Sequence, residues 1–114
     1  MKSHLKTLLV LAIGLGVFFW LRGGSVSSER AHELVSQGAK LVDVRTPEEF
    51  ASGHIAGAIN IPVSQIEARA HELGAKEGPL VVYCHAGVRS RRAADILERA
   101  GFKLVHDLGA MSRW

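Results

Sequence analysis

The stretch Leu80–Arg92, LVVYCHAGVRSRR, decides the fold that the sequence predicts. It opens with an unbroken apolar run, Leu80–Tyr83, whose β-branched and aromatic side chains are typical of a strand buried on both faces. The only cysteine, Cys84, follows at once, and a short loop then leads into a helix with Ser90 as the expected N-cap and Gly101 as the expected stop. In a parallel α/β sheet, chemistry is presented at such a strand end.

The charges around Cys84 indicate an anionic group at this loop. Four basic side chains lie in the loop and the first helical turn: His85, Arg89, Arg91 and Arg92. Cations oppose the dipole of a helix N-terminus, and a thiolate, an anionic substrate, or both would remove that conflict. The loop amides and the helix start form a candidate anion-binding nest. The alternative is that Cys84 is a small core residue and that the arginines form a solvated helix face.

Length and composition limit the function classes. The 114 residues suffice for one domain with a modest core, and the formal net charge of +3 lies entirely in residues 1–25. The remaining 11 basic and 11 acidic side chains balance, so the composition gives no support to nucleic-acid binding. A single cysteine excludes an internal disulfide and a C-x-x-C redox pair, and the histidines lack metal-ligand spacing. We expect no metal and no other cofactor.

The first 25 residues have the pattern of an export or anchor segment. An apolar run covers Leu8–Leu21, with Lys2 and Lys6 before it and Arg22 after it. As a helix this run reaches roughly 21 Å, short of the ~30 Å hydrocarbon core of a membrane, which suits a secretory signal. Extended to residues 5–22, with basic side chains snorkelling, it becomes a marginal membrane span.

We favour an uncleaved anchor over cleavage before Ser28, since the bulky Phe18–Trp20 end is typical of an interfacial anchor. In either case we expect Lys2 and Lys6 to stay on the cytoplasmic side of the membrane and the domain to be exported. The sequence thus divides into a signal or anchor segment with a linker, residues 1–25, and one domain, residues 26–114.

The domain alternates strands with short helices. The predicted strands are Lys40–Val44, Ala58–Pro62, Leu80–Tyr83 and Lys103–Asp107. The predicted helix caps are Ser28, a capping box at Thr46–Glu49 with Pro47 in the first turn, and a second capping box at Ser64–Glu67. This alternation predicts an α/β fold with a central, mostly parallel sheet, helices on both faces and right-handed crossovers.

Four stretches carry a family resemblance: LVDVRTPEEFASGHIAGAINIP (Leu41–Pro62), VVYCHAGVRS (Val81–Ser90), AADILERAGF (Ala93–Phe102) and LGAMSRW (Leu108–Trp114). Together they resemble a single-domain rhodanese, a thiosulfate sulfurtransferase-like protein, with Ala110 where a second glycine is common. With its first 25 residues, the chain is similar in layout to the small periplasmic rhodaneses of bacteria. The resemblance implies a rhodanese-like fold, an anchor in the bacterial inner membrane and a periplasmic domain; the alternative is a cleaved, soluble periplasmic form.

The resemblance also implies a persulfide enzyme, a monomer in which Cys84 is the nucleophile. Cys84 would take a sulfane sulfur from a small anionic donor such as thiosulfate and pass it to cyanide or a thiol. The donor and the persulfide would be held by the loop residues His85, Ala86, Gly87, Val88, Arg89 and Ser90. Arg89 is the expected clamp for the thiosulfate oxygens, because its forked donors fit an oxyanion.

Two other functions remain open. Cysteine phosphatases share this loop architecture, but their C-x5-R loops place five residues between Cys and Arg, whereas four separate Cys84 from Arg89 here. The smaller loop suits a sulfur atom better than a phosphate. A non-catalytic persulfide carrier or redox-sensing module would use the same cysteine, and only turnover distinguishes it from an enzyme.

Four residues outside the loop have structural interpretations as well as functional ones. Asp43 and Arg45 lie at the carboxyl end of a predicted strand, and we expect them to form an ion pair that supports the loop or the neighbouring turn. We expect His54 to be a hydrogen-bonded turn residue rather than a base. Trp114 either covers the pocket mouth or packs against the core.

Overall fold

The computed structural model describes residues 23–114. The predicted export segment over residues 5–22 lies outside the described residues. Within residues 23–114, no helix has both the length and the apolar character needed to cross a membrane.

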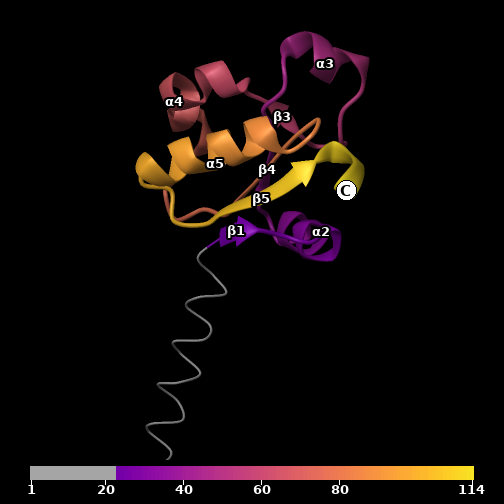
Figure 1. Ribbon diagram of the computed structural model, residues 1–114. Coiled ribbons are helices and arrows are strands. Elements are labelled where there is room, and N and C mark those ends of the chain that lie inside the picture. Colours follow the sequence, from indigo (N-terminus) through magenta and orange to yellow (C-terminus); the bar gives the residue numbers. More distant parts are fainter. Residues whose placement is uncertain (1–22) are drawn as a thin grey trace, which may run out of the picture.

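A five-stranded parallel sheet forms the centre of the domain (Figure 1). Its strands are β1 (Gly23–Ser25), β2 (Lys40–Asp43), β3 (Ile59–Asn60), β4 (Leu80–Cys84) and β5 (Val105–Ala110), in the order β1-β5-β4-β2-β3. All four pairings are parallel. The central strand β4 is buried along its whole length, as its apolar sequence predicts. The predicted α/β fold with a parallel sheet is confirmed.

Helices cover both faces of the sheet (Figure 1). They are α2 (Ser28–Ser36), α3 (Pro47–Ser52), α4 (Ile66–Arg69) and α5 (Val88–Arg99), with 3-10 turns at Val63–Gln65, Ala70–Leu73 and Met111–Arg113. Side chains alternate between the faces of a strand, so Val81 and Tyr83 of β4 pack with the α2 side. Val82 and Cys84 pack with the α4 and α5 side. The Cys84 side chain therefore lies on the α5 face of the sheet.

The turn after β2 forms as the sequence predicts. Thr46 caps α3 through its Oγ1, which accepts from the Glu49 N–H at 3.2 Å, and Glu49 Oε1 accepts from the Thr46 N–H at 3.1 Å. Pro47 stands in the first turn of this helix, and Gly53 ends it. Because α3 starts directly after the carboxyl end of β2, it lies at the end of the sheet where β4 presents Cys84.

Two predicted caps outside the Cys84 loop are wrong. The cap of α2 is Ser27, whose Oγ accepts from the Arg30 N–H at 3.1 Å, whereas Ser28 donates to the carbonyl oxygen of Trp114 at 3.0 Å. The second capping box, Ser64–Glu67, does not form. A 3-10 turn begins directly after Pro62, whose carbonyl accepts from the Gln65 N–H at 2.8 Å, so the chain is already helical at Ser64.

Three strands differ from their predicted positions. The strand predicted at Ala58–Pro62 is limited to Ile59–Asn60, which form β3. Residues 23–25, predicted to be linker, form the edge strand β1, which pairs with β5. Gly23 permits this pairing, because a Cβ at that position would lie 2.2 Å from the Val105 carbonyl oxygen. The last strand begins at Val105 and continues to Ala110, past the predicted end at Asp107, through an irregularity in its pairing with β4.

Candidate active site

Cys84 is the last residue of β4, and its side chain is 1% exposed. The loop that follows turns back over the sulfur, so that the N–H of Gly87 donates to Cys84 Sγ at 2.9 Å. A backbone donor at that distance, next to the N-terminus of the 12-residue helix α5, stabilises negative charge on the sulfur. The structure thus confirms that the thiol lies at a strand end that feeds a helix start.

The N-cap of α5 is Gly87 rather than Ser90. Gly87 has φ of 104°, a left-handed conformation that a residue with a Cβ adopts only with strain. Ser90 is fully buried inside the first turn, and its Oγ donates to the Gly87 carbonyl at 3.1 Å. The first N–H groups of a helix lack intrahelical acceptors, and no described side chain caps those of α5. They remain available to an anion.

Arg89 is paired with a carboxylate that the sequence analysis missed. Its Nη1 donates to Glu49 Oε1 at 2.6 Å and its Nη2 donates to Glu49 Oε2 at 2.9 Å. Hydrogen bonds from Arg89, and next from the Thr46 N–H, lower the pKa of Glu49 to about 2. The pKa of Arg89 is raised, chiefly by its hydrogen bonds to Glu49 and also by the nearby Cys84. Arg89 thus stands within electrostatic reach of the sulfur while it bonds to α3.

A buried ion pair fixes the other end of α3. Arg45 Nε donates to Asp43 Oδ1 at 3.0 Å, and its Nη2 donates to Asp43 Oδ2 at 2.7 Å, with both side chains buried. The same Nη2 donates to the Gly53 carbonyl at 2.7 Å, at the C-cap of α3. Asn60 Nδ2 donates to the carbonyls of both Asp43 and Arg45. The predicted structural ion pair is confirmed, and it positions the helix that carries Glu49.

Tyr83 supports this arrangement from the α2 side of the sheet. Its hydroxyl oxygen accepts from the Ile55 N–H at 3.1 Å, and the guanidinium carbon of Arg45 lies 5.8 Å from its ring centroid. Burial raises the pKa of Tyr83 to about 12, so its hydroxyl stays protonated at neutral pH. Tyr83 is therefore a neutral structural residue behind the loop.

The remaining predicted residues lie around this end of the molecule. His54 is a turn residue, as predicted: its Nδ1 is 2.8 Å from the Phe50 carbonyl oxygen, and its ring stacks on Phe50 with centroids 3.6 Å apart. Trp114 stacks on His32 of α2, also at 3.6 Å. Trp114 therefore packs on α2.

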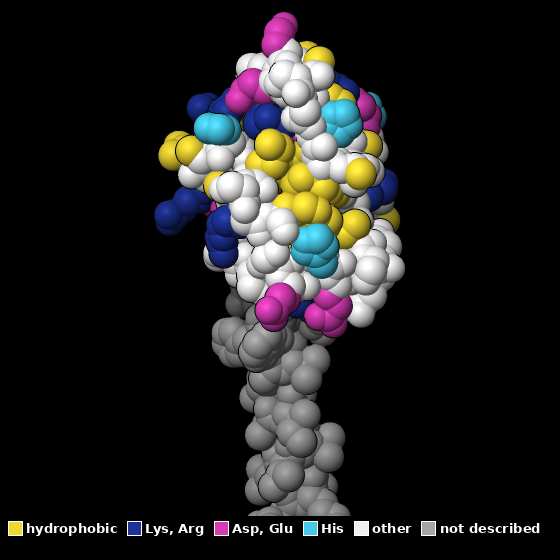
Figure 2. Space-filling model, turned by 90° about the vertical axis from the view of Figure 1, so that its right-hand side faces the viewer, with side chains coloured by type: hydrophobic (Ala, Val, Ile, Leu, Met, Phe, Trp, Pro, Cys, Tyr) yellow, Lys and Arg dark blue, Asp and Glu magenta, His cyan; other side chains and the backbone are white. Residues whose placement is uncertain are grey.

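Figure 2 shows the end of the molecule toward which β5 runs. Hydrophobic side chains lie at the centre of this face, with histidines beside them.

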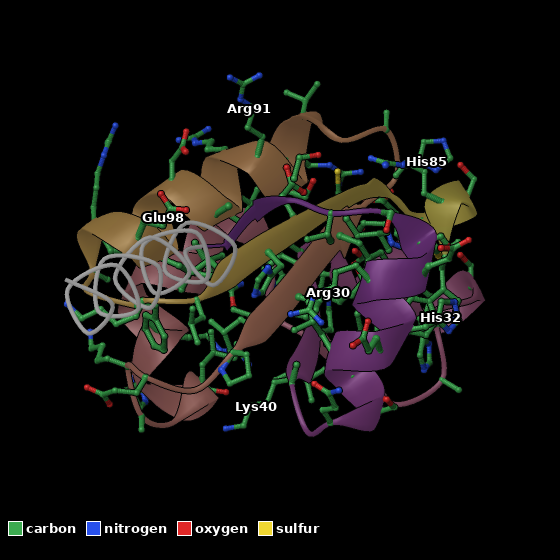
Figure 3. All side chains as sticks on the ribbon, turned by 90° about the horizontal axis from the view of Figure 1, so that it is seen from below. Arg30, His32, Lys40, His85, Arg91 and Glu98 are labelled. Atoms are coloured by element: carbon green, nitrogen blue, oxygen red, sulfur yellow. The ribbon has the colours of Figure 1, made fainter. Side chains whose placement is uncertain are left out.

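The other basic residues of the loop and helix are exposed. His85 is exposed on the loop, and Arg91 extends away from α5 (Figure 3). Arg92 is also exposed, so both arginines belong to a solvated helix face. A hollow of about 560 Å³ borders the loop at Ala86, Gly87 and Val88 on the side of β5, but Cys84 does not line it. Of the four basic side chains, Arg89 is the one that is partly buried and paired with a carboxylate.

Within residues 23–114, no three side chains of His, Cys, Asp or Glu are grouped so that they could hold a metal ion.

Comparison with known proteins gives concordant matches. A family model described as the rhodanese-like domain matches residues 27–114. The chain is 38% identical over 103 residues to thiosulfate sulfurtransferase 16, chloroplastic, of Arabidopsis thaliana, a match covering 79% of this chain and 85% of that protein. It is 44% identical over 77 residues to the uncharacterized protein YqhL of Bacillus subtilis, covering 67% of this chain but only 60% of the length of that relative.

The fold is also similar to a solved structure, the human single domain sulfurtransferase TSTD1. The TM-score is 0.72 at 32% sequence identity, and the match covers 79% of this chain and 93% of that one.

Proposed function

The chain belongs to the family of rhodanese-like domains, and from that premise we propose that it is a thiosulfate sulfurtransferase that works through a persulfide on Cys84. The observation that carries the proposal is the hydrogen bond of 2.9 Å from the Gly87 N–H to Cys84 Sγ, at an uncapped helix start with Arg89 beside it. This arrangement favours a thiolate and can hold an anion against it.

The proposed reaction has two displacement steps. The Cys84 thiolate attacks the outer sulfur of thiosulfate, the sulfur–sulfur bond breaks, and sulfite leaves with the bonding electron pair. The enzyme then holds a persulfide, whose terminal sulfur carries a negative charge. A thiophile such as cyanide or a thiolate attacks that terminal sulfur and takes it away, which regenerates the Cys84 thiolate. No external oxidant or reductant is needed, because each step exchanges one bond to sulfur for another.

The loop would contribute in both steps. Sulfite departs as an anion and the persulfide is an anion, so donors aimed at this position stabilise both. The Gly87 N–H already contacts the sulfur, and the free N–H groups at the start of α5 are available to the terminal sulfur. Arg89 can bind oxygens of the donor through those N–H groups that Glu49 does not occupy, because a guanidinium has five.

Steady-state kinetics test the proposal and its two rivals together. We expect the purified chain to convert thiosulfate and cyanide to thiocyanate and sulfite over many turnovers, and we expect Cys84→Ser to abolish this activity. Hydrolysis of p-nitrophenyl phosphate should be near background, because only four residues separate Cys84 from Arg89, one fewer than in a C-x5-R phosphatase loop. The shorter loop suits a sulfur nucleophile that accepts sulfur better than one that accepts a phosphoryl group.

The opposite substrate preference would show a cysteine phosphatase. A single stoichiometric release of sulfite without thiocyanate turnover would show a persulfide carrier.

A further inference from the structure

Glu49 is an acidic residue held next to a site that is proposed to bind anions. Its two carboxylate oxygens accept from Nη1 and Nη2 of Arg89 at 2.6 and 2.9 Å. Glu49 Oε1 also accepts from the Thr46 N–H at 3.1 Å and from Thr46 Oγ1 at 3.2 Å. The carboxylate is thus held to the first turn of α3 by Thr46 as well as by Arg89.

The Arg89–Glu49 pair neutralises the guanidinium that lies within electrostatic reach of Cys84. Among the acidic groups near Arg89, Asp43 is already bonded to Arg45, so Glu49 is the carboxylate that neutralises Arg89. In the proposed reaction Cys84 attacks as a thiolate, which adds a further negative charge to the site. A doubly charged donor therefore meets two negative groups and one paired cation.

We propose that Glu49 sets the charge of the sulfur donor that the loop accepts, and that it disfavours doubly charged donors relative to singly charged ones. The Coulomb energy between Glu49 and a donor scales with the charge of the donor, so repulsion of a dianion is about twice that of a monoanion at the same place. This inference rests on the proposed sulfur transfer and names the donor class that the site favours: singly charged sulfane donors, such as thiosulfonates and persulfides.

A different role for Glu49 makes the opposite prediction. If Glu49 only orients Arg89, its removal would let the guanidinium move, and the rate would fall for every donor that Arg89 binds. If Glu49 repels the donor, its removal frees Arg89 and raises the rate, most of all for a dianion. The sign of the change separates the two roles.

The kinetic test compares thiosulfate with methanethiosulfonate, in which a methyl group replaces one charged oxygen of thiosulfate. In Glu49→Gln we expect kcat/KM for thiosulfate to rise about fivefold relative to that for methanethiosulfonate, the order expected of one partly screened unit charge. The gain should shrink as salt is added. Glu48→Gln is the matched control, since it removes the same charge from an exposed neighbour in the same helix turn, and its donor ratio should stay at the wild-type value.

A second comparison uses the Arg89→Ala background. Arg89→Ala alone should lower kcat/KM for thiosulfate at least about tenfold, since a charge-assisted contact is lost and Glu49 is left unpaired. Adding Glu49→Gln should then recover part of that loss, because the repulsion acts without Arg89. An orienting role predicts no recovery. A fall for both donors in Glu49→Gln, an unchanged donor ratio, or no recovery in this background would overturn the inference.

A third measurement does not depend on sulfur transfer. Iodoacetamide alkylates cysteine thiolates, and Cys84 is the only cysteine in the chain. We expect an anion bound at the loop to slow the alkylation of Cys84. We expect Glu49→Gln to increase protection by sulfate more than protection by methanesulfonate. If the variant gains no preference for sulfate, or if neither anion protects Cys84, the inference is wrong. Loss of turnover with this preference intact would count against the proposed reaction only.

Discussion

The Asp43–Arg45 pair offers a direct test of how the fold holds the site. In Asp43→Asn an amide of nearly the same shape replaces the carboxylate, so the change removes the charge and little volume. Asp43 is 0% exposed and accepts from the Arg45 N–H, Nε and Nη2, while Arg45 is 4% exposed. The guanidinium would be left buried without a counter-charge. Breaking a buried pair from one side costs about 3–5 kcal/mol of unfolding free energy.

Urea denaturation followed by tryptophan fluorescence measures this loss. Glu72→Gln is the control, because Glu72 forms a comparable pair with Arg69 at 2.7 Å in which both side chains are exposed, and exposed pairs contribute little. We expect a large drop in the urea midpoint for Asp43→Asn and little change for Glu72→Gln. Adding Arg45→Met to Asp43→Asn should restore part of the stability by removing the unpaired charge. Equal effects of Asp43→Asn and Glu72→Gln would refute the reasoning.

Three further predictions concern the loop, the sheet and the first 25 residues. A Cβ at Gly87 or at Gly38 would stand on a backbone with φ of 104° or 106°. Gly87→Ala and Gly38→Ala should therefore each lower the free energy of unfolding by about 1 kcal/mol in urea denaturation. Only Gly87→Ala should also lose thiosulfate turnover. Burial, with a smaller contribution from Arg30, lowers the pKa of His106. The folded protein therefore resists protonation of His106 and loses stability as pH falls below about 6.5. The drop in Tm between about pH 7 and pH 5 should be smaller in His106→Gln than in the wild type, and an equal drop would exclude this role. We also propose that the domain is exported: a reporter enzyme that works only outside the cytoplasm, fused after Trp114, should be active, whereas activity of a cytoplasmic reporter alone would contradict the proposal.

The features that were predicted correctly depend on residues that are close together in the sequence. The Thr46 capping box needs only four consecutive residues, and it forms. The apolar run of β4 becomes the buried central strand, and Cys84 ends it. Asp43 and Arg45 are two residues apart at a strand end, which is close enough for a pair to be expected from the sequence.

The features that the sequence missed depend on contacts between distant segments. The Gly-Gly-Ser segment of β1 has low strand propensity, and it is a strand only because it pairs with β5. Ser90 has the chemistry of a cap, but the loop is closed one turn earlier by the left-handed Gly87. Glu49 lies 40 residues from Arg89, and Asp95 was the nearest acid in the sequence. A sequence analysis that paired β2 with β4 in parallel could have found this contact, because α3 and the Cys84 loop then follow neighbouring strands at the same end of the sheet.

Mass spectrometry of the chain after incubation with thiosulfate tests the central proposal most directly. We expect the intact mass to increase by one sulfur atom, with the adduct on the peptide that contains Cys84, and we expect cyanide or a reducing thiol to remove it. Cys84→Ser should gain no adduct under the same conditions. Sulfite release from wild-type protein without a sulfur adduct on Cys84, or an adduct that cyanide does not remove, would contradict a persulfide mechanism.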